Sequence, residues 1–195
     1  MSLAHRDAAN WREVAERLLA DHRRLDRLTS DLLMLARLDE GTATRVATPV
    51  RLDEIVAAEI PEITHAVVTA HLEQIEVVGV VPELSRLVRN LLDNADRHAA
   101  TTIDVRLARD GATAVLTIDD DGAGIPADQR DRVFDRFYRV DGGRDRSSGG
   151  VGLGLAMVRG IARRHRGDVT ISTAPAGGAR FEVRLPADSA WVQVG

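Results

Sequence analysis

Three glycines at alternate positions, followed at once by an apolar helical pattern, constrain this chain more than any other segment. The stretch runs Gly149-Gly150-Val151-Gly152-Leu153-Gly154-Leu155-Ala156-Met157-Val158. Glycine lets a loop approach a ligand closely, and the free backbone N–H groups at the start of a helix favour an anion. The segment therefore predicts a phosphate-binding loop that leads into a helix, while glycines at this spacing also serve ordinary turns.

Composition limits the classes of protein that remain. The chain has 195 residues, enough for one domain with a core and an appendage, and it contains no Cys, which excludes disulfides and thiolate metal sites. The net charge of −4 and the aromatic content of 3% predict no nucleic-acid surface. No apolar run approaches the roughly 20 residues that cross a bilayer, and no signal peptide opens the chain. We therefore expect a soluble, cytoplasmic piece.

A long helix is predicted from Asn10 to Asp39, because neither Gly nor Pro interrupts this stretch. Its apolar residues recur at helical spacing: Val14, Leu18, Leu25, Leu28, Leu32 and Leu35. Such a stripe needs to pack, either against a second helix, in this chain or in another, or against its own domain. The sequence after Gly41 is rich in Thr and indicates a linker. We divide the chain into a helix at 1–41, a linker at 42–48, a domain at 49–187 and a tail at 188–195.

A second helix, which begins at Pro82-Glu83, carries the first group of candidate site residues. Its core-facing positions are Leu84, Leu87, Val88, Leu91 and Leu92, and its last turns place on one polar face Asn90, Asn94, Arg97 and His98. Asn is a poor helix former, so two of them at this spacing indicate a reason other than helix propensity. The alternative is a solvated helix end, with basic residues favoured by the helix dipole.

An acidic turn follows a predicted hairpin. Residues 101–108 and 112–118 alternate apolar and polar around Asp110-Gly111, and the second strand leads into Asp119-Asp120-Asp121-Gly122-Ala123-Gly124. The glycines let a ligand approach, and Asp120 can accept a hydrogen bond from an amine at the base of a pocket. A calcium loop would need further oxygen ligands at fixed spacing, the last of them a Glu, and these ligands are missing here. An ordinary charged turn is the other alternative.

The remaining segments complete an alternating pattern of strands and helices. We expect short strands at 50–52, 66–69 and 75–81, and a helix that is capped by Asp53 and ended by Pro61. A short helix is expected at 130–138, with Val133, Phe134 and Phe137 available for burial. Residues 141–150 are rich in Gly, Ser and charge and predict a mobile lid. The helix after the glycines should run to about His165, with strands at 168–173 and 180–185 behind it.

Taken in this order, four motifs resemble the catalytic and ATP-binding domain of sensor histidine kinases. They are the Asn-bearing helix, the Asp-Gly-x-Gly turn, the segment Phe134-x-x-Phe137-Tyr138, and Gly150-x-Gly152-Leu153-Gly154-Leu155. The domain belongs to a superfamily with DNA gyrase, heat-shock chaperone and mismatch-repair ATPases. The resemblance covers about residues 46–187, and residues 28–39 are similar to the second helix of the kinase dimerisation hairpin. It implies an α+β fold, a two-layer sandwich with a mixed sheet (the Bergerat-type ATP-binding fold), preceded by one long helix.

The resemblance implies a role for each candidate residue. Asn94 would coordinate Mg²⁺ at the phosphates, with Asn90 near the metal or the γ-phosphate, and Asp120 would accept a hydrogen bond from the adenine amino group. Arg97, where the family often has Lys, and Arg139 would contact phosphate. The other residues implied at the nucleotide are His98, Gly122, Gly124, Tyr138, Gly150, Val151, Gly152, Leu153, Gly154 and Leu155.

The sequence departs from the family at the phosphoacceptor. The family's acceptor His is followed by an acidic residue and a Pro, and neither His5 nor His22 has this context. The chain resembles a kinase without its first hairpin helix, either trimmed or half of a split kinase. We expect a histidine protein kinase that binds ATP and Mg²⁺, does not autophosphorylate by itself, and presents the γ-phosphate to a His supplied elsewhere.

The implied partners are those of two-component signal transduction: a response regulator and, in the intact kinase, a second copy of the chain. The resemblance also allows a membrane anchor in the intact kinase. Gyrase-type relatives carry Glu at the position of Asn90, so fast ATP hydrolysis is not expected here. The alternatives are an anti-sigma-type serine kinase or partner-binding regulator with the same ATP fold, and a degenerate nucleotide sensor.

Overall fold

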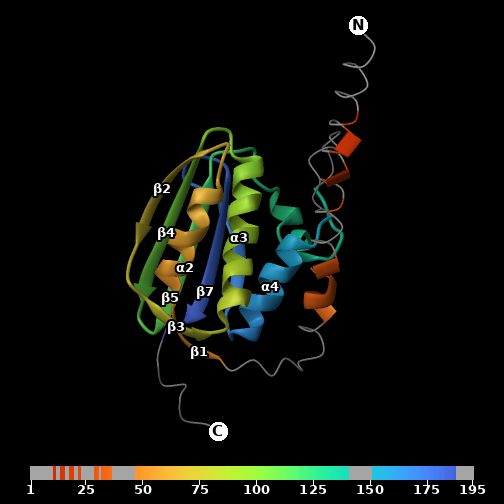
Figure 1. Ribbon diagram of the computed structural model, residues 1–195. Coiled ribbons are helices and arrows are strands. Elements are labelled where there is room, and N and C mark those ends of the chain that lie inside the picture. Colours follow the sequence, from red (N-terminus) through yellow and green to blue (C-terminus); the bar gives the residue numbers. More distant parts are fainter. Residues whose placement is uncertain are drawn as a thin grey trace, which may run out of the picture.

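The computed structural model describes residues 47–140 and 151–187 together with part of the segment 11–36 (Figure 1). Within that segment the described positions are 11, 14–15, 18–19, 22, 29–30 and 32–36, and all of them are helical, in agreement with the apolar periodicity. The predicted lid at 141–150, the tail at 188–195 and the linker up to residue 46 lie outside the described residues.

A five-stranded mixed sheet forms one layer of the domain. Its order is β2 (Val67–Leu72), β4 (Thr102–Asp110), β5 (Thr113–Asp120), β7 (Ala179–Pro186) and β6 (Asp168–Thr173). Strand β2 is parallel to β4, and the other neighbours are antiparallel. A separate antiparallel pair joins β1 (Thr48–Arg51) to β3 (Glu76–Gly79). The turn between β4 and β5 places Gly111 at a φ of 60°, as the Asp-Gly pair predicts.

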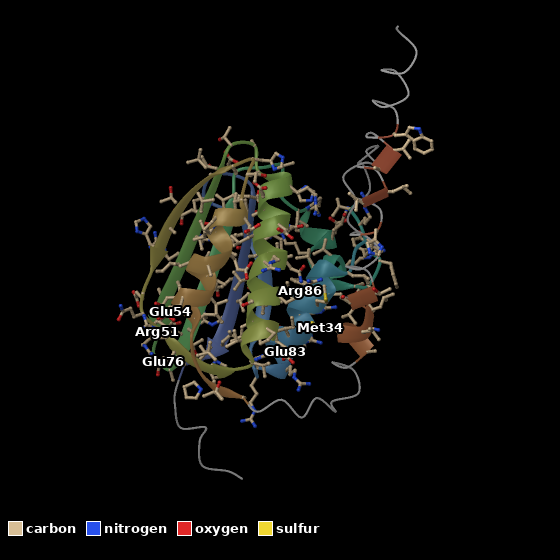
Figure 2. All side chains as sticks on the ribbon, viewed as in Figure 1. Met34, Arg51, Glu54, Glu76, Glu83 and Arg86 are labelled. Atoms are coloured by element: carbon tan, nitrogen blue, oxygen red, sulfur yellow. The ribbon has the colours of Figure 1, made fainter. Side chains whose placement is uncertain are left out.

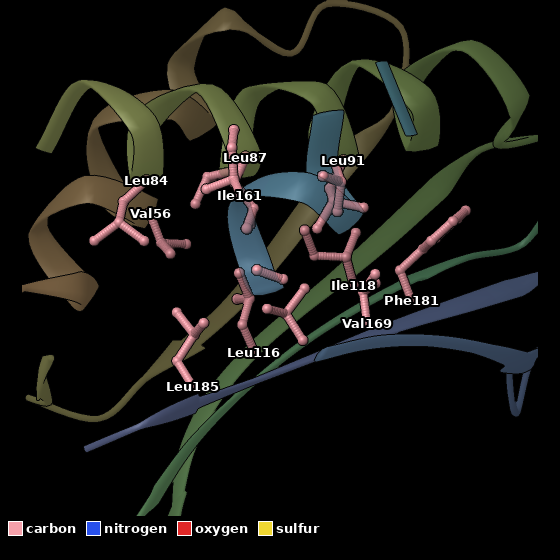
Figure 3. Close-up of a cluster of buried hydrophobic side chains, with 14 of the residues drawn as sticks. Val56, Leu84, Leu87, Leu91, Leu116, Ile118, Ile161, Val169, Phe181 and Leu185 are labelled. Carbon is pink, nitrogen blue, oxygen red and sulfur yellow. The ribbon is translucent and has the colours of Figure 1, made fainter. Parts of the chain in front are cut away.

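Three helices form the second layer over one face of this sheet (Figure 1). They are α2 (Leu52–Glu59), α3 (Val81–His98) and α4 (Gly154–Arg164). The core lies between the layers, where Leu87 and Leu91 of α3 and Ile161 of α4 pack towards the sheet residues Leu116 and Phe181 (Figure 3). Every one of these side chains is at most 1% exposed, so burial of apolar surface fixes the face that each helix presents. The α+β two-layer prediction is confirmed.

The prediction that Asp53 caps the first helix of this domain is wrong. The N-cap is Arg51, two residues earlier, and the helix begins at Leu52, which is buried at 1% exposure. Asp53 lies in the first turn, where its carboxylate accepts hydrogen bonds from the Arg51 guanidinium at 2.9 and 2.6 Å. That contact lowers the pKa of Asp53. Glu54 and Glu76 lie beside the same guanidinium (Figure 2). The helix ends at Glu59, and Pro61 lies in the 3₁₀ turn that follows it, η1 (Ile60–Glu62).

The single short helix expected at 130–138 is also wrong. One 3₁₀ turn, η3 (Arg132–Phe134), lies within these residues, and a second, η2 (Ala127–Gln129), ends just before them. Val133 and Phe134 are buried as expected, whereas Phe137 is 62% exposed at a φ of 63°. The physical reason is a tertiary contact, because the Phe137 N–H donates to the Gly152 carbonyl at 2.9 Å and turns the chain out of helical geometry.

Candidate functional site

The polar face of α3 forms one side of the candidate site. Asn90 and Asn94 are partly buried on it, and Arg97 and His98 are exposed at its C-terminal end. The Asn90 side-chain nitrogen is buried and has no hydrogen-bond partner among the described residues. The first residue of α4 lies against it, since a Cβ on Gly154 would be 3.4 Å from Asn90 Oδ1. The structure therefore brings one Asn of the predicted pair to the glycine turn.

The three adjacent carboxylates after β5 have three different surroundings. Asp119 forms an ion pair with Arg180, at 2.6 Å. Asp121 accepts hydrogen bonds from the hydroxyl of Thr101 and from the backbone N–H groups of Thr101 and Thr102, which hold the pKa of Asp121 far below its usual range. Both carboxylates are thus satisfied by the protein itself, and these separate partners offset the electrostatic repulsion among three adjacent carboxylates.

Asp120 differs from its two neighbours because it is buried, at 2% exposure, and only half satisfied. Its Oδ1 accepts hydrogen bonds from the N–H groups of Gly122 at 2.9 Å and Ala179 at 3.1 Å. Its Oδ2 is buried without a hydrogen-bond partner in the described part of the chain. Burying an unpaired carboxylate oxygen costs free energy, so an acceptor left in this state indicates a site for a donor on a ligand.

Two glycines enclose this carboxylate. A Cβ on Gly122 would collide with the carbonyl oxygen of His98, and a Cβ on Gly178 would collide with Asp120 itself. Gly122 was expected at the site from the sequence. Gly178 and the N–H of Ala179 were missed, since the Pro175-Ala176-Gly177-Gly178 run indicated only a turn between strands. Gly124, at a φ of 71°, packs against this turn, with the carbonyl oxygen of Gly178 3.2 Å from the position of a Cβ.

The glycine turn before α4 is joined to the Phe137–Tyr138 segment. Gly152 has a φ of 76°, and a Cβ there would be 2.8 Å from the Tyr138 carbonyl oxygen, so only glycine fits. Leu153 is buried at 2% exposure, which leaves its backbone rather than its side chain for a ligand. Val151 and Leu155 are partly buried against the core, and Gly150 lies outside the described residues.

Tyr138 is engaged by the protein. Its hydroxyl donates to Gln129 Oε1 at 3.2 Å, and the Arg132 guanidinium lies 4.6 Å from its ring centroid. This arrangement helps to fix the segment that leads into Arg139.

His98 shows that several predicted site residues lie close together. Desolvation and the positive charges of Arg97 and Arg139 lower the pKa of His98 from its ordinary value of 6.5, and the negative charge of Asp120 acts in the opposite direction. The imidazole is therefore mainly neutral at pH 7. Arg97, Arg139 and Asp120 come from three separate segments, so the fold gathers them around the C-terminal end of α3.

The donor set limits how a metal could be held. Within residues 47–140, 151–187 and the described positions before them, no three His, Asp or Glu side chains lie together as a metal cluster. Mg²⁺ is commonly bound through one or two protein oxygens together with substrate phosphates and water, so a carboxamide oxygen at Asn94 or Asn90 fits such a role.

The mixed sheet, the helices over one of its faces and the half-satisfied carboxylate at the end of β5 define an α+β domain with a candidate ligand site. Residues 79–189 match the family described as histidine kinase-, DNA gyrase B-, and HSP90-like ATPase, and the chain belongs to this family. Within it, the relatives below identify the chain as an ATP-binding domain of the sensor histidine kinase type.

The chain is 35% identical over 174 residues to the sensor histidine kinase RppB of Synechocystis sp., an alignment that covers 84% of this chain and 38% of that protein. It is 30% identical in sequence to the mycobacterial sensor histidine kinase MprB, whose solved structure matches with a TM-score of 0.64 over 72% of this chain and 97% of that one. The ATP-binding domain of PrrB from Mycobacterium tuberculosis matches with a TM-score of 0.60 and 29% identity, over 74% and 100% of the two chains. The helices that the structure describes include none that could span a membrane.

Proposed function

We propose that this chain binds Mg²⁺–ATP between α3 and residues 151–155 and acts as the catalytic part of a sensor histidine kinase. The observation that carries the proposal is the buried Asp120 Oδ2, which has no partner among the described residues. The exocyclic amino group of adenine is a donor of the kind this acceptor lacks, and a charged acceptor makes a stronger hydrogen bond than a neutral one.

The phosphates would lie at the other side of this pocket, along the polar face of α3. Asn94 would supply an oxygen to Mg²⁺, with Asn90 beside Gly154 near the metal or the γ-phosphate. Arg97 and Arg139 would contact phosphate oxygens, and His98 lies close enough to both for their charges to act on it. When bound, Mg²⁺ neutralises phosphate charge. The backbone from Val151 to Leu155 would then line the phosphate chain at the start of α4.

Phosphoryl transfer depends mainly on positioning and on stabilising charge, which these residue types supply. Asn90 has no basic group at neutral pH, so it cannot activate water, and slow hydrolysis is expected. We propose that the γ-phosphate passes to a histidine supplied elsewhere, on another helix or chain, and then to a response regulator. The relatives reported above are sensor histidine kinases, which gives the anti-sigma-type alternative no support. In the intact kinase we propose a homodimer.

Calorimetric titration with ATP and ADP, with and without Mg²⁺, tests the binding step. We expect Mg²⁺-dependent binding to the folded chain, and its complete absence would refute the proposal. The transfer step requires a separate hairpin fragment that carries an acceptor His, incubated with labelled ATP. Label on that His supports the kinase role, whereas nucleotide binding without any transfer would contradict it.

A further inference from the structure

We propose that Arg164 and His165, at the C-terminal end of α4, hold α3 in the register that the phosphate side of the nucleotide site requires. His165 is then a positioning residue, which acts on the nucleotide only through the two helices. The inference rests on the proposed nucleotide site, since its consequence is read in nucleotide affinity. The two residues with their partners Val80 and Glu83 are called the α3–α4 latch below.

The imidazole of His165 has a defined partner at each nitrogen. Nδ1 lies 2.8 Å from the carbonyl oxygen of Ile161, which can only accept, so Nδ1 carries the proton. Nε2 is then an acceptor, and the backbone N–H of Val80 donates to it at 3.1 Å. Val80 is the N-cap of α3, so a side chain from α4 binds a backbone donor at the start of α3.

Glu83 completes the latch. It stands at the third position of α3, from which a Glu commonly reaches back to the N–H of the N-cap residue. Here its carboxylate pairs with α4, because Arg164 Nε lies 3.1 Å from Glu83 Oε2. Glu83 is 6% exposed and lies at the N-terminal end of α3, beside α4 (Figure 2). His165 therefore binds the N–H of the N-cap residue of α3, and its neighbour Arg164 forms an ion pair with Glu83 in the first turn.

The space for the imidazole comes from Gly79, the last residue of β3. A Cβ at this position would be 2.9 Å from His165 Cδ2 and 2.6 Å from Leu84 Cδ1. The helix α4 ends directly before His165. Arg166 adopts a φ of 56° and its N–H donates to Arg163 O at 2.9 Å, which turns the chain out of the helix at this point. A residue without a side chain and a fixed helix end together seat the ring against Val80.

The latch lies opposite the nucleotide site along the same pair of helices. The end of α4 contacts the start of α3, and the start of α4, Gly154, contacts Asn90 further along α3, so the helices are antiparallel. Between these contacts the helices share buried apolar residues such as Leu87 and Ile161. Apolar packing is weakly directional, whereas a hydrogen bond and an ion pair specify one register. Loss of the latch should therefore shift Gly154 relative to Asn90 while the core stays packed.

The test compares two substitutions at one position. Gln can place an amide oxygen where His165 presents Nε2 to Val80, whereas Leu fills similar space and offers no acceptor. We expect His165→Leu to weaken Mg²⁺–ADP binding about 5-fold or more, a coupling typical of linked sites. His165→Gln should keep most of the affinity. Adenosine, which depends on Asp120 and lacks phosphates, should bind all three proteins alike.

The readouts separate positioning from simple destabilisation. Affinities are measured by calorimetry at a temperature where thermal melts show each variant folded, with Arg163→Gln, an exposed change in the same turn, as the matched control. If His165→Leu does not fold, Arg164→Gln replaces it and should show the same loss for Mg²⁺–ADP over adenosine. Equal losses for both ligands, or no rescue by Gln, would overturn the inference. Failure of the wild-type chain to bind any nucleotide would overturn the proposed function first.

Discussion

The two halves of α3 differ in what they contact. Its N-terminal end, called the closed end, is bound by residues at the end of α4, and the polar face from Asn90 to His98, called the open end, borders the candidate site. The Val80 N–H and the Glu83 carboxylate are both bound by residues of α4. Around the other end, Asn90 Nδ2 and Asp120 Oδ2 are buried without a partner in the described part of the chain. The closed end also holds such an atom, because Glu83 Oε2 forms its ion pair with Arg164 without a hydrogen bond. What distinguishes the open end is that its two unpartnered groups, an amide donor and a carboxylate acceptor, lie at the candidate site.

The largest effect is expected at the open end, from Asp120→Asn. The amide oxygen can still accept from Gly122 and Ala179, which directs the NH₂ group into the pocket at the position of the present Oδ2. The new NH₂ group and the adenine amino group, which are both donors, would then face each other, and the hydrogen bond from adenine to Oδ2 would be lost. A hydrogen bond to a charged group is worth up to about 3 kcal/mol, so we expect about a 100-fold loss of ATP and adenosine affinity by calorimetry.

The matched control is the same chemical change one residue earlier. Asp119→Asn disturbs the ion pair with Arg180 and leaves the pocket untouched, so its nucleotide affinity should equal that of the wild-type chain. A comparable loss in both variants would show that the acidic triplet acts through general charge rather than through one oriented oxygen.

At the closed end, Glu83→Ala should lower stability. It removes the carboxylate that pairs with Arg164, whose side chain is 19% exposed. Removing one partner of a buried pair is destabilising, and the partial exposure of Arg164 moderates the loss to about 2 kcal/mol, measured by urea unfolding. The double variant Glu83→Leu/Arg164→Leu should regain part of this free energy of unfolding. A double variant less stable than Glu83→Ala would mean that the pair contributes more than its desolvation costs.

A smaller effect is expected from Asn94→Ala, which removes the proposed metal oxygen. We expect about a 10-fold weaker affinity for ATP in the presence of Mg²⁺, the loss of one good ligand contact of about 1.4 kcal/mol. Without Mg²⁺ the Asn94→Ala variant and the wild-type chain should bind ADP with equal affinity. A loss that is independent of Mg²⁺ would assign Asn94 to a direct phosphate contact instead.

The sequence predicts the open end better than the closed one. Asn90 and Asn94 are recognised from helical spacing, and Asp120 from its place before two glycines, because both signals are local. The latch is not predicted, since Val80 and His165 are 85 residues apart and a backbone N–H carries no side-chain signal. The same limit explains Phe137, whose exposure follows from a bond to Gly152 rather than from its own apolar character. The predicted roles of the site residues stay predictions.

The smallest expected effect concerns the charge of His98 at the open end. In the free protein its titration, followed by NMR of the imidazole carbons, should have a midpoint below the ordinary 6.5, because desolvation and the charges of Arg97 and Arg139 lower its pKa. Its contribution to stability is therefore present above pH 6.5 and is lost as the pH falls, since the unfolded chain takes up the proton first.

Arg139→Gln should move this midpoint upward, and Arg106→Gln, on the exposed side of β4, should leave it in place. Bound Mg²⁺–ADP should also raise it, because phosphate charge favours the imidazolium. A midpoint unaffected by Arg139→Gln would place the Arg139 side chain away from His98, and with it away from the proposed phosphates. The open end of α3 would then hold the adenine through Asp120 but would lack one of the cations proposed for the phosphates.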